Sequence, residues 1–271
     1  MRKTIRSINI QKIFLVTDFG LKDYYVAALK EVILSLCPNV TIIDVSHLVH
    51  PGNIIEGSFI TWQLSLLNIS KSGILVVVDP GVGTKRDPMA IFCRNENVLI
   101  GPDNGVLYPL AMALGIEKIY RIDYSNKEYF PTISNTFHGR DIFARAMGYI
   151  CLGIFNILIP KSNMVKNDIF LYVKKANKII FKILYVDHFG NVVTNIPCSE
   201  DIPNTCILRI RGKMYKLKLV RTFGDLKPDE LGILCGSSGL YEIVCNLCRA
   251  SKILGCEVGD TGELQLRKIV Y

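Results

Sequence analysis

The chain has 271 residues, enough for one large domain or two modest ones, and it is 49% hydrophobic and 21% charged. A mean hydropathy of +0.29 excludes a disordered chain, and no apolar run reaches the roughly 18 to 20 residues that a membrane span needs. The formal net charge of +8 comes from lysines scattered among apolar residues, which favours solvated strand faces over a nucleic-acid interface.

The N-terminal segment MRKTIRSINIQKIFLVTDFG places basic residues before an apolar run. IFLVT is too short for the core of a signal peptide, and it leads into a charged segment without a cleavage-like site. We therefore expect a cytoplasmic protein that does not associate with a membrane. An organelle address within the first dozen residues stays open as an alternative.

The first half of the chain alternates strand and helix patterns. In chain order, the expected elements are a strand at 12–17, a helix at 23–36, a strand at 40–46, a helix at 52–67, strands at 73–79, 89–94 and 97–103, a helix at 105–115, a strand at 116–123 and a helix at 139–153. The strand at 73–79 is almost entirely apolar, as expected of a strand covered on both faces. This order predicts an N-terminal layered α/β domain with a mainly parallel sheet, at residues 1–163.

After about residue 160 the long helical patterns disappear. The segments 169–196, 205–223 and 232–248 alternate apolar and polar residues between turn signals. This pattern predicts a smaller C-terminal antiparallel β domain at residues 168–271, with the boundary in IPKSNMVKND.

The nine cysteines form an odd number in a chain that is not short and secreted, and most stand in apolar contexts. We therefore expect buried free thiols. The pair in CNLC, Cys245 and Cys248, has a spacing found in zinc sites, but no second pair follows at similar spacing, so we expect no metal there.

Polar residues stand at the ends of several predicted strands, where the ligands of α/β sheets gather. They are Asp18, Asp44, His47, Asp79, Asp103 and Asn104, and His138 stands just before a helix. A single carboxylate at such a place is often a turn or helix cap. Several together favour a shared cleft.

The stretch VVVDPGVGTKRDP ends a buried strand on Asp79 and then turns tightly through PGVG, so that Arg86 can fold back toward Asp79. A carboxylate beside a guanidinium stays ionised and can hold a water molecule, and His138 could complete the arrangement. Spacing alone leaves two readings open, a structural ion pair with a helix-capping histidine and a catalytic group.

Seven motifs occur in the order TDFG, DVSH, EGSF, VVDPGVGT, PDNG, TFHGRDIF and DHFGNVVTNI. Each is weak alone, but the ordered set covers nearly the whole chain. Together the motifs closely resemble the S-adenosyl-L-methionine hydroxide adenosyltransferase family, whose relatives include fluorinases and chlorinases.

The resemblance implies an enzyme that hydrolyses S-adenosyl-L-methionine to adenosine and L-methionine. In this family an Asp–Arg–His set activates the water that attacks the ribose 5′ carbon, and Asp79, Arg86 and His138 match that set. No cofactor or metal is implied, because a sulfonium is already a good leaving group. Halogenase relatives carry Tyr at the Asp position and replace the His and Gly of FHG, so Asp79, His138 and Gly139 imply water over halide.

The resemblance also implies a set of substrate-binding residues. Asp18 matches the ribose-hydroxyl ligand, Asp187 and Asn191 the ligands of the methionine ammonium, and Ser237 a ligand of the methionine carboxylate. Asn246 matches a segment along the adenine, and Phe137 is expected to pack near the nucleoside. Two residues depart from the family pattern: Ser238 replaces an arginine of the fluorinase-type relatives, and Leu247 replaces a smaller residue.

For the whole molecule, the resemblance implies an α/β domain followed by a β-barrel-like domain. It also implies a homotrimer whose site lies between subunits, with S-adenosyl-L-methionine and adenosine as the molecules bound. From the scattered lysines we expect no nucleic-acid partner. Three alternatives stay open. They are a metal-dependent phosphoesterase using Asp18, Asp79, Asp103, His138 and Asp141, an S-adenosylmethionine- or nucleoside-binding protein without turnover, and a basic nucleic-acid-binding module.

Overall fold

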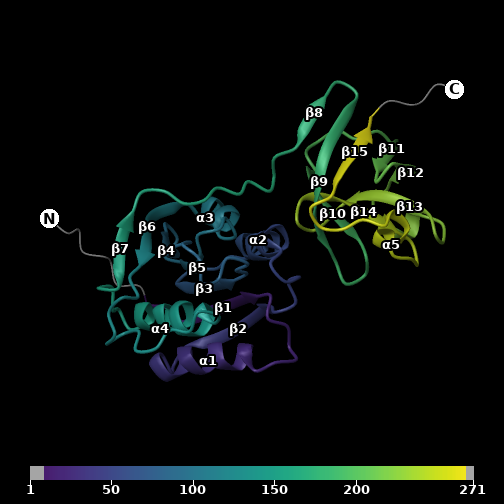
Figure 1. Ribbon diagram of the computed structural model, residues 1–271. Coiled ribbons are helices and arrows are strands. Elements are labelled where there is room, and N and C mark those ends of the chain that lie inside the picture. The colour runs from purple at the N-terminus through teal and green to yellow at the C-terminus, as the bar shows by residue number, and fades with distance from the viewer. Residues whose placement is uncertain (1–8, 267–271) are drawn as a thin grey trace. The chain divides into compact units, whose positions relative to one another are not determined.

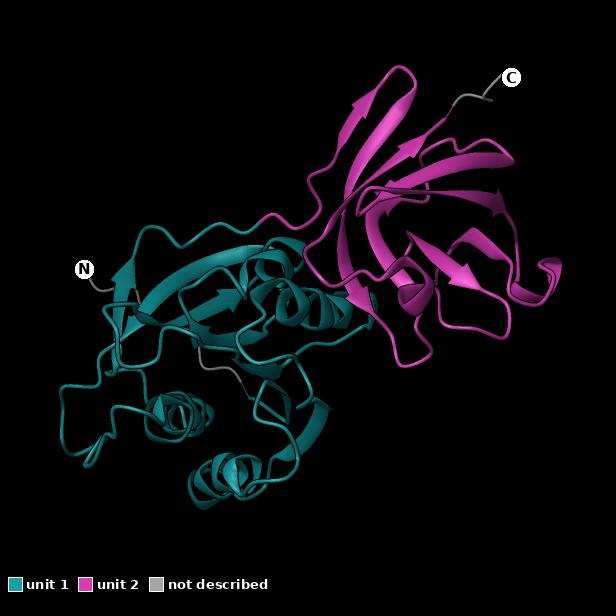
Figure 2. Ribbon diagram, turned by 45° about the vertical axis from the view of Figure 1, so that its right-hand side comes forward, with its two compact units in different colours: residues 1–167 teal, residues 168–271 magenta. Residues whose placement is uncertain are grey.

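The computed structural model describes residues 9–266, which divide into two compact units (Figures 1 and 2). The first unit ends at Asn167 and the second begins at Asp168. The first unit is α/β and the second is almost entirely β, which confirms the predicted fold class.

The first unit is built on a seven-stranded sheet in the order β2-β1-β3-β5-β4-β6-β7. The pairs β1–β2, β1–β3 and β3–β5 are parallel, whereas the pairs that involve β4 and β7 are antiparallel. The strands are β1 (Lys12–Thr17), β2 (Thr41–Ser46), β3 (Ser72–Val77), β4 (Pro88–Cys93), β5 (Val98–Pro102), β6 (Ile116–Ile122) and β7 (Leu158–Lys161).

Helices cover both faces of this sheet (Figure 1). The helices are α1 (Tyr25–Leu36), α2 (Ile54–Trp62), α3 (Tyr108–Leu114) and α4 (Arg145–Cys151); α2 continues as a short 3-10 turn, and a π-helical turn (Gly139–Ala144) precedes α4. Every residue of β3 is buried, as its apolar run predicts for a strand covered on both sides. The core against α1 and α4 joins Leu29 and Met147 to Leu15 and Leu75 of the sheet.

The strand β7 was not among the predicted elements. Its sequence LIPK contains a proline and lies largely within the predicted boundary segment, so its pattern is that of a connection. It pairs antiparallel with β6 at the edge of the sheet, where a proline is tolerated because no further strand needs its missing N–H group.

The second unit is a closed seven-stranded barrel with one additional edge strand. The order is β10-β14-β13-β12-β11-β15-β9-β8, and β10 also pairs with β9, which closes the ring. The strands are β8 (Val173–Lys175), β9 (Lys178–Val186), β10 (Val192–Pro197), β11 (Thr205–Ile210), β12 (Lys213–Leu219), β13 (Leu231–Cys235), β14 (Leu240–Cys245) and β15 (Thr261–Gln265). A short helix, α5 (Ala250–Leu254), packs against β14.

The barrel strands alternate apolar and polar residues, so their apolar side chains pack inside the barrel and their polar side chains face outward. In β11 the buried residues Cys206, Leu208 and Ile210 face the interior, while the residues between them are more exposed. The scattered lysines occupy the outer positions, as in β12, where only Leu217 is buried. In the described part of the chain, every helix is too short or too polar to cross a bilayer.

The prediction of free thiols is wrong for six of the nine cysteines. The structure pairs them as the disulfides Cys37–Cys151, Cys198–Cys235 and Cys245–Cys248, with Cα–Cα distances of 6.4, 5.6 and 5.3 Å. Two of the three pairs join segments far apart in sequence, and such proximity depends on how α1 packs on α4 and how the barrel closes. Cys93, Cys206 and Cys256 are buried free thiols, as predicted.

Candidate functional site

The carboxylates Asp18 and Asp79 follow two neighbouring parallel strands. Thr17 at the end of β1 is the register partner of Val77 at the end of β3, so the chain segments that follow them leave the same edge of the sheet. The two carboxylates are close enough for the charge of Asp79 to influence the ionisation of Asp18. The fold thus brings together two carboxylates that lie 61 positions apart in the sequence.

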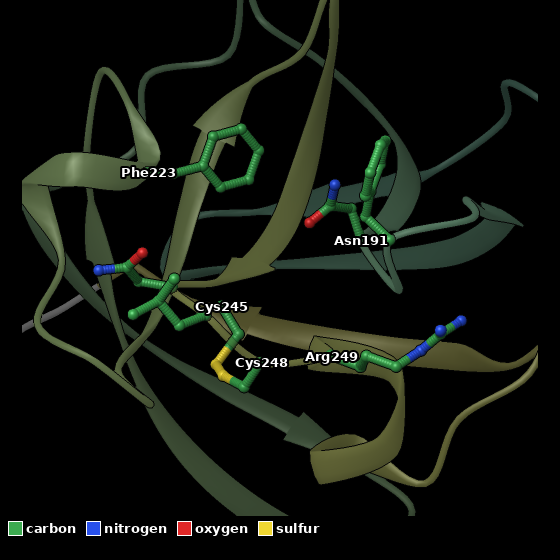
Figure 3. A pocket seen from close by; sticks show the side chains of 8 residues that line it. Asn191, Phe223, Cys245, Cys248 and Arg249 are labelled. Atoms are coloured by element: carbon green, nitrogen blue, oxygen red, sulfur yellow. A yellow bond between two sulfur atoms is a disulfide. The ribbon is translucent and has the colours of Figure 1, made fainter.

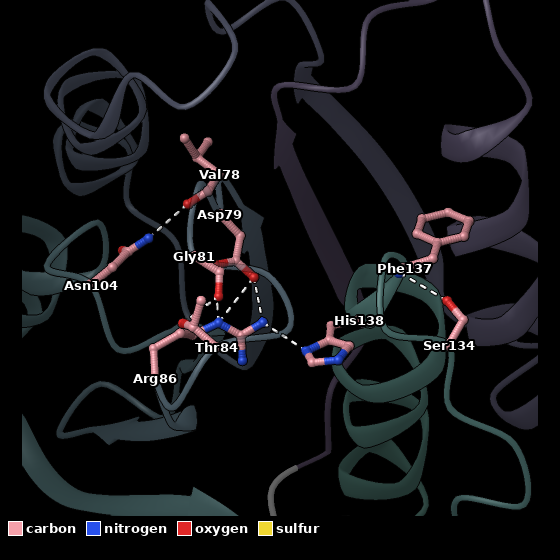
Figure 4. A network of polar contacts seen from close by, with 9 residues as sticks. All are labelled: Val78, Asp79, Gly81, Thr84, Arg86, Asn104, Ser134, Phe137 and His138. Atoms are coloured by element: carbon pink, nitrogen blue, oxygen red, sulfur yellow. Dashed lines mark hydrogen bonds and ion pairs between the residues drawn. The ribbon is translucent and has the colours of Figure 1, made fainter.

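Asp79, Arg86 and His138 form one hydrogen-bonded network (Figure 4). Arg86 Nε donates to both carboxylate oxygens of Asp79 at 3.0 Å, and its NH2 group donates to Asp79 Oδ2. The same NH2 group lies 2.9 Å from Nδ1 of His138. The side chains of Arg86 and Asp79 are only 9% and 5% exposed, so this ion pair is screened little by solvent.

The PGVG turn returns Arg86 to Asp79, as its sequence predicts. Val82 N donates to Asp79 O at 3.2 Å, and Thr84 Oγ1 donates to Gly81 O at 2.7 Å. Gly83 has a φ of +76°, and a Cβ atom there would lie 2.8 Å from the carbonyl oxygen of Asn135. The turn therefore passes directly against the segment that leads to His138.

The contact with Arg86 determines the tautomer of His138. A guanidinium has no acceptor, so His138 Nδ1 must accept the hydrogen bond, and the neutral ring carries its hydrogen on Nε2. Burial, followed by the positive charge of Arg86, lowers the pKa of His138. The ring is thus held neutral, with Nε2–H as the donor that it can offer to a water molecule or hydroxide.

Asp18 lies beside this network and has a different environment. Its Oδ2 atom accepts a hydrogen bond of 2.8 Å from Gly52 N. Burial raises the pKa of Asp18 against the effect of that hydrogen bond, and the charge of Asp79 contributes to the rise. A partly buried carboxylate of this kind gains from hydroxyl donors, such as those of a sugar diol.

Phe137 is buried in an aromatic cluster next to His138. Its ring centroid lies 5.7 Å from that of Phe19, 5.1 Å from that of Tyr25 and 6.3 Å from that of Tyr24, all in edge-to-face geometry. The guanidinium carbon of Arg140 lies 5.0 Å from the centroid of the Phe137 ring. Phe137 thus forms part of an apolar wall supplied largely by the loop after Asp18.

In the second unit, Asp187 and Asn191 bind each other across the β9–β10 turn. Asn191 N and Nδ2 donate to the two oxygens of Asp187, each at 2.8 Å. The turn is also closed through the backbone, because Asp187 N donates to Asn191 O at 3.0 Å. The pair predicted to hold an ammonium group is therefore preorganised as one hairpin turn.

Asn191 and Asn246 both line a cavity of about 490 Å³ (Figure 3). Asn246 Nδ2 donates to Leu226 O at 2.7 Å, so this side chain also fixes the backbone of the neighbouring loop. The other residues that line the cavity are Phe189, Phe223, Cys245, Leu247, Cys248 and Arg249. The two phenylalanines, 73% and 44% exposed, offer aromatic faces of the kind on which a nucleobase stacks.

Phe189 and Phe223 were not among the site residues predicted from the sequence. Phe189 stands inside the DHFGN motif, so its position was a usable signal. Phe223 lies in a segment with no motif, and only the folding of the barrel places it beside Asn246.

Ser237 does not line this cavity. It is exposed in the turn between β13 and β14, which Gly236 N closes by donating to Leu240 O at 2.9 Å. The carboxylate of Glu242 lies directly against Gly236 in the same hairpin. Burial raises the pKa of Glu242, and the charge of Asp187 contributes to the rise. Glu242 is thus an acidic group near the predicted ammonium ligand Asp187, and it was not predicted from the sequence.

Two ligands of the phosphoesterase alternative, Asp103 and Asp141, are paired with other groups of the protein. Asp103 accepts from Val165 N at 2.7 Å and pairs with Lys161, and Asp141 pairs with Arg140. Within residues 9–266, no group of three or more His, Cys, Asp or Glu side chains is arranged to hold a metal ion. The carboxylates of that set are instead satisfied by cations and backbone N–H groups of the protein.

Comparison with known proteins identifies relatives over nearly the whole chain. Residues 13–156 match the model of the SAM hydroxide adenosyltransferase N-terminal domain, and residues 181–263 match that of the C-terminal domain. A crystal structure of an uncharacterized conserved protein from Thermotoga maritima superposes with a TM-score of 0.84 at 35% identity, covering 93% of this chain and 99% of that one.

Curated relatives have names that agree with this match. An (R)-S-adenosyl-L-methionine hydrolase from Salinispora tropica is 35% identical over 90% of this chain and 94% of its own, and one from Methanocaldococcus jannaschii is 33% identical over 93% and 95%. A fluorinase from Nocardia brasiliensis is 26% identical over 79% of this chain and 78% of its own. The chain therefore belongs to the SAM hydroxide adenosyltransferase family.

Proposed function

We propose that this protein hydrolyses S-adenosyl-L-methionine to adenosine and L-methionine by attack of water on the ribose 5′ carbon, without a metal or cofactor. The observation that carries the proposal is the buried network of Asp79, Arg86 and His138. Family membership and the names of the curated hydrolases support the choice of substrate.

In this mechanism Asp79 orients the attacking water and helps to remove its proton. Both of its oxygens accept from Arg86, but a carboxylate oxygen has a second lone pair for a water molecule. Arg86 and the Nε2–H group of His138 stabilise the developing hydroxide in a site of low dielectric. The leaving thioether is neutral, so the step needs no leaving-group acid.

Substrate binding is divided between the two units. Asp18 accepts from the ribose hydroxyls, and Phe137 packs near the nucleoside. Asp187 and Asn191 hold the methionine ammonium, Ser237 its carboxylate, and Asn246 lies along the adenine, where the cavity with Phe189 and Phe223 supports an aromatic base. We place this activity in the cytoplasm and in a homotrimer whose site lies between subunits.

The test is to incubate the purified protein with S-adenosyl-L-methionine and EDTA and to follow adenosine and methionine by chromatography. We expect stoichiometric adenosine and methionine, because no metal takes part. The Asp79→Ala variant should lose at least ~100-fold in kcat, the lower end of what a positioned acid or base contributes.

The outcomes separate the alternatives. Intact substrate with saturable binding would identify a binding protein without turnover. Activity that EDTA abolishes would point to a metal-dependent enzyme. Full activity of Asp79→Ala would remove the proposed role of the network while leaving the reaction in place.

A further inference from the structure

His47 is a buried histidine, 3% exposed, that the proposed reaction does not use. It follows β2, and because Ser46 at the end of β2 is the register partner of Val16, His47 lies alongside the end of β1. Its Nδ1 atom is 2.8 Å from Thr17 Oγ1, and its Nε2 atom is 3.1 Å from Asp44 Oδ1. The second contact has the distance of an ion pair without the alignment of a hydrogen bond.

Threonine, histidine and aspartate in this order resemble a nucleophile with its base and orienting acid. Thr17 is 0% exposed, however, so its hydroxyl has no access to a substrate. The Asp44 carboxylate also pairs with a second cation, because Lys30 Nζ donates to Asp44 Oδ2 at 2.6 Å. The arrangement therefore serves the structure around it and is not itself a catalytic centre.

His47 forms hydrogen bonds with the chain on both sides of Asp18. Before Asp18, Thr17 bonds to the imidazole, and its Oγ1 also accepts from Phe19 N at 3.3 Å. After Asp18, Gly20 N donates to the carbonyl oxygen of His47 at 2.7 Å. Two of the contacts that hold this four-residue segment end on His47, although its side chain does not bond to Asp18. A further contact holds the backbone of Asp18 itself, whose N–H group donates to Val77 O at 3.3 Å.

We propose that His47 and Thr17 are positioning residues that set the direction of the Asp18 carboxylate toward the ribose hydroxyls. This inference rests on the proposed function, in which Asp18 is the ribose ligand. Asp18 has two further anchors, its own N–H group, which donates to Val77 O at 3.3 Å, and the hydrogen bond from Gly52 N to Oδ2. On either side of these anchors, His47 holds the Thr17–Gly20 segment through the Thr17 hydroxyl and the Gly20 N–H group. A small rotation of that segment would misalign the carboxylate while the protein stays folded.

The test compares Thr17→Val, which removes the hydroxyl at nearly constant volume, with Thr17→Ser, which keeps it. For each variant we would measure kcat and KM for S-adenosyl-L-methionine, the melting temperature, and inhibition by adenosine and by 2′,3′-dideoxyadenosine. We expect Thr17→Val to raise KM about tenfold, the effect of roughly one hydrogen bond, with kcat changed less than about threefold. The preference for adenosine over the dideoxy analogue should decrease in the same variant. Thr17→Ser should restore the KM and this preference.

A double-mutant cycle with Asp18→Asn distinguishes positioning from general structural damage. If Thr17 acts through Asp18, adding Thr17→Val to Asp18→Asn should change KM less than about twofold. An undiminished effect in that background, or a fall in melting temperature without loss of the ribose preference, would overturn the proposal.

Two further arms keep the outcomes distinct. Should Thr17→Val fail to fold, His47→Gln replaces it, because a glutamine amide can reach Asp44 as Nε2 does but leaves Thr17 without its partner. If Asp18→Asn alone leaves KM and the ribose preference unchanged, Asp18 is no ribose ligand and this inference fails, while hydrolysis, tested with Asp79, still stands.

Discussion

At the residue scale, the protonation state of His138 is decided by one neighbour. Arg86 can only donate, so Nδ1 of His138 must stay unprotonated for the network to exist. Burial and the charge of Arg86 both act in this direction and lower the pKa of His138 below its usual 6.5. The ring is therefore neutral at any pH above the lowered pKa. As the pH falls through that pKa, protonation of Nδ1 breaks the contact with Arg86.

We therefore expect His138 to titrate with a midpoint below 6.5, and kcat/KM to decline on the acid side of that value. The measurement is an NMR titration of the four histidine rings, with His138→Asn identifying the signal. Arg86→Met, which removes the charge at similar length, should move the midpoint upward. A midpoint at or above 6.5 in the unaltered protein would contradict the assigned tautomer.

At the element scale, the connection from β3 to β4 determines whether the network forms. Its PGVG turn has to bring Arg86 back to the strand end and also pass the backbone before His138. Gly83 meets both demands, with a φ of +76° and no side chain against the Asn135 carbonyl. An alanine there would be strained by its conformation and would collide with backbone that cannot move aside cheaply.

Gly83→Ala should therefore lower the free energy of unfolding and separate Arg86 from His138. Gly212→Ala is the matched control, because Gly212 has a φ of +75° and nothing within 4 Å of the added Cβ. The control should lower the free energy of unfolding by about 1 to 2 kcal/mol, the energy of the left-handed conformation for an alanine. In denaturant unfolding, we expect Gly83→Ala to lower the free energy of unfolding more than the control does, and to lose activity. Equal losses of stability and full activity would show that the close approach to Asn135 is unimportant.

At the scale of the whole molecule, the predicted site residues are divided between the two units. Asp18, Asp79, Arg86, Phe137 and His138 belong to the first, and Asp187, Asn191, Ser237 and Asn246 to the second. Neither unit carries the full predicted set. The proposed homotrimer would account for this division if one subunit supplied the catalytic network and its neighbour the remaining ligands.

That arrangement predicts complementation between two inactive variants. Asp79→Ala and Asp187→Ala, co-refolded in equal amounts, should regain about one quarter of the unaltered activity, because that share of sites receives two intact halves. The assay is adenosine release, with light scattering to establish the oligomeric state. No recovery in mixed oligomers of demonstrated composition would place each site within one chain.

The local patterns of the sequence were sufficient for the fold class and for much of the candidate site. Apolar periodicity predicted the helices and strands of the first unit, apart from β7, because burial of one helix face or of a whole strand leaves a direct trace in the order of residues. The strand-end positions of Asp18 and Asp79, and the return of Arg86 through PGVG, also follow from short segments whose turn chemistry is local. The ordered motifs correctly identified the family.

Only the tertiary structure decided which distant residues meet. The contact of His47 with Thr17, the pairing of Cys37 with Cys151 and the place of Phe223 beside Asn246 each join segments that no local pattern relates. Such contacts depend on strand register and on the packing of whole elements, because a shift of one residue in a strand turns every side chain to the opposite face. The sequence by itself determined the elements and the chemistry at their ends, and the packing of those elements decided the partners that hold this chemistry in place.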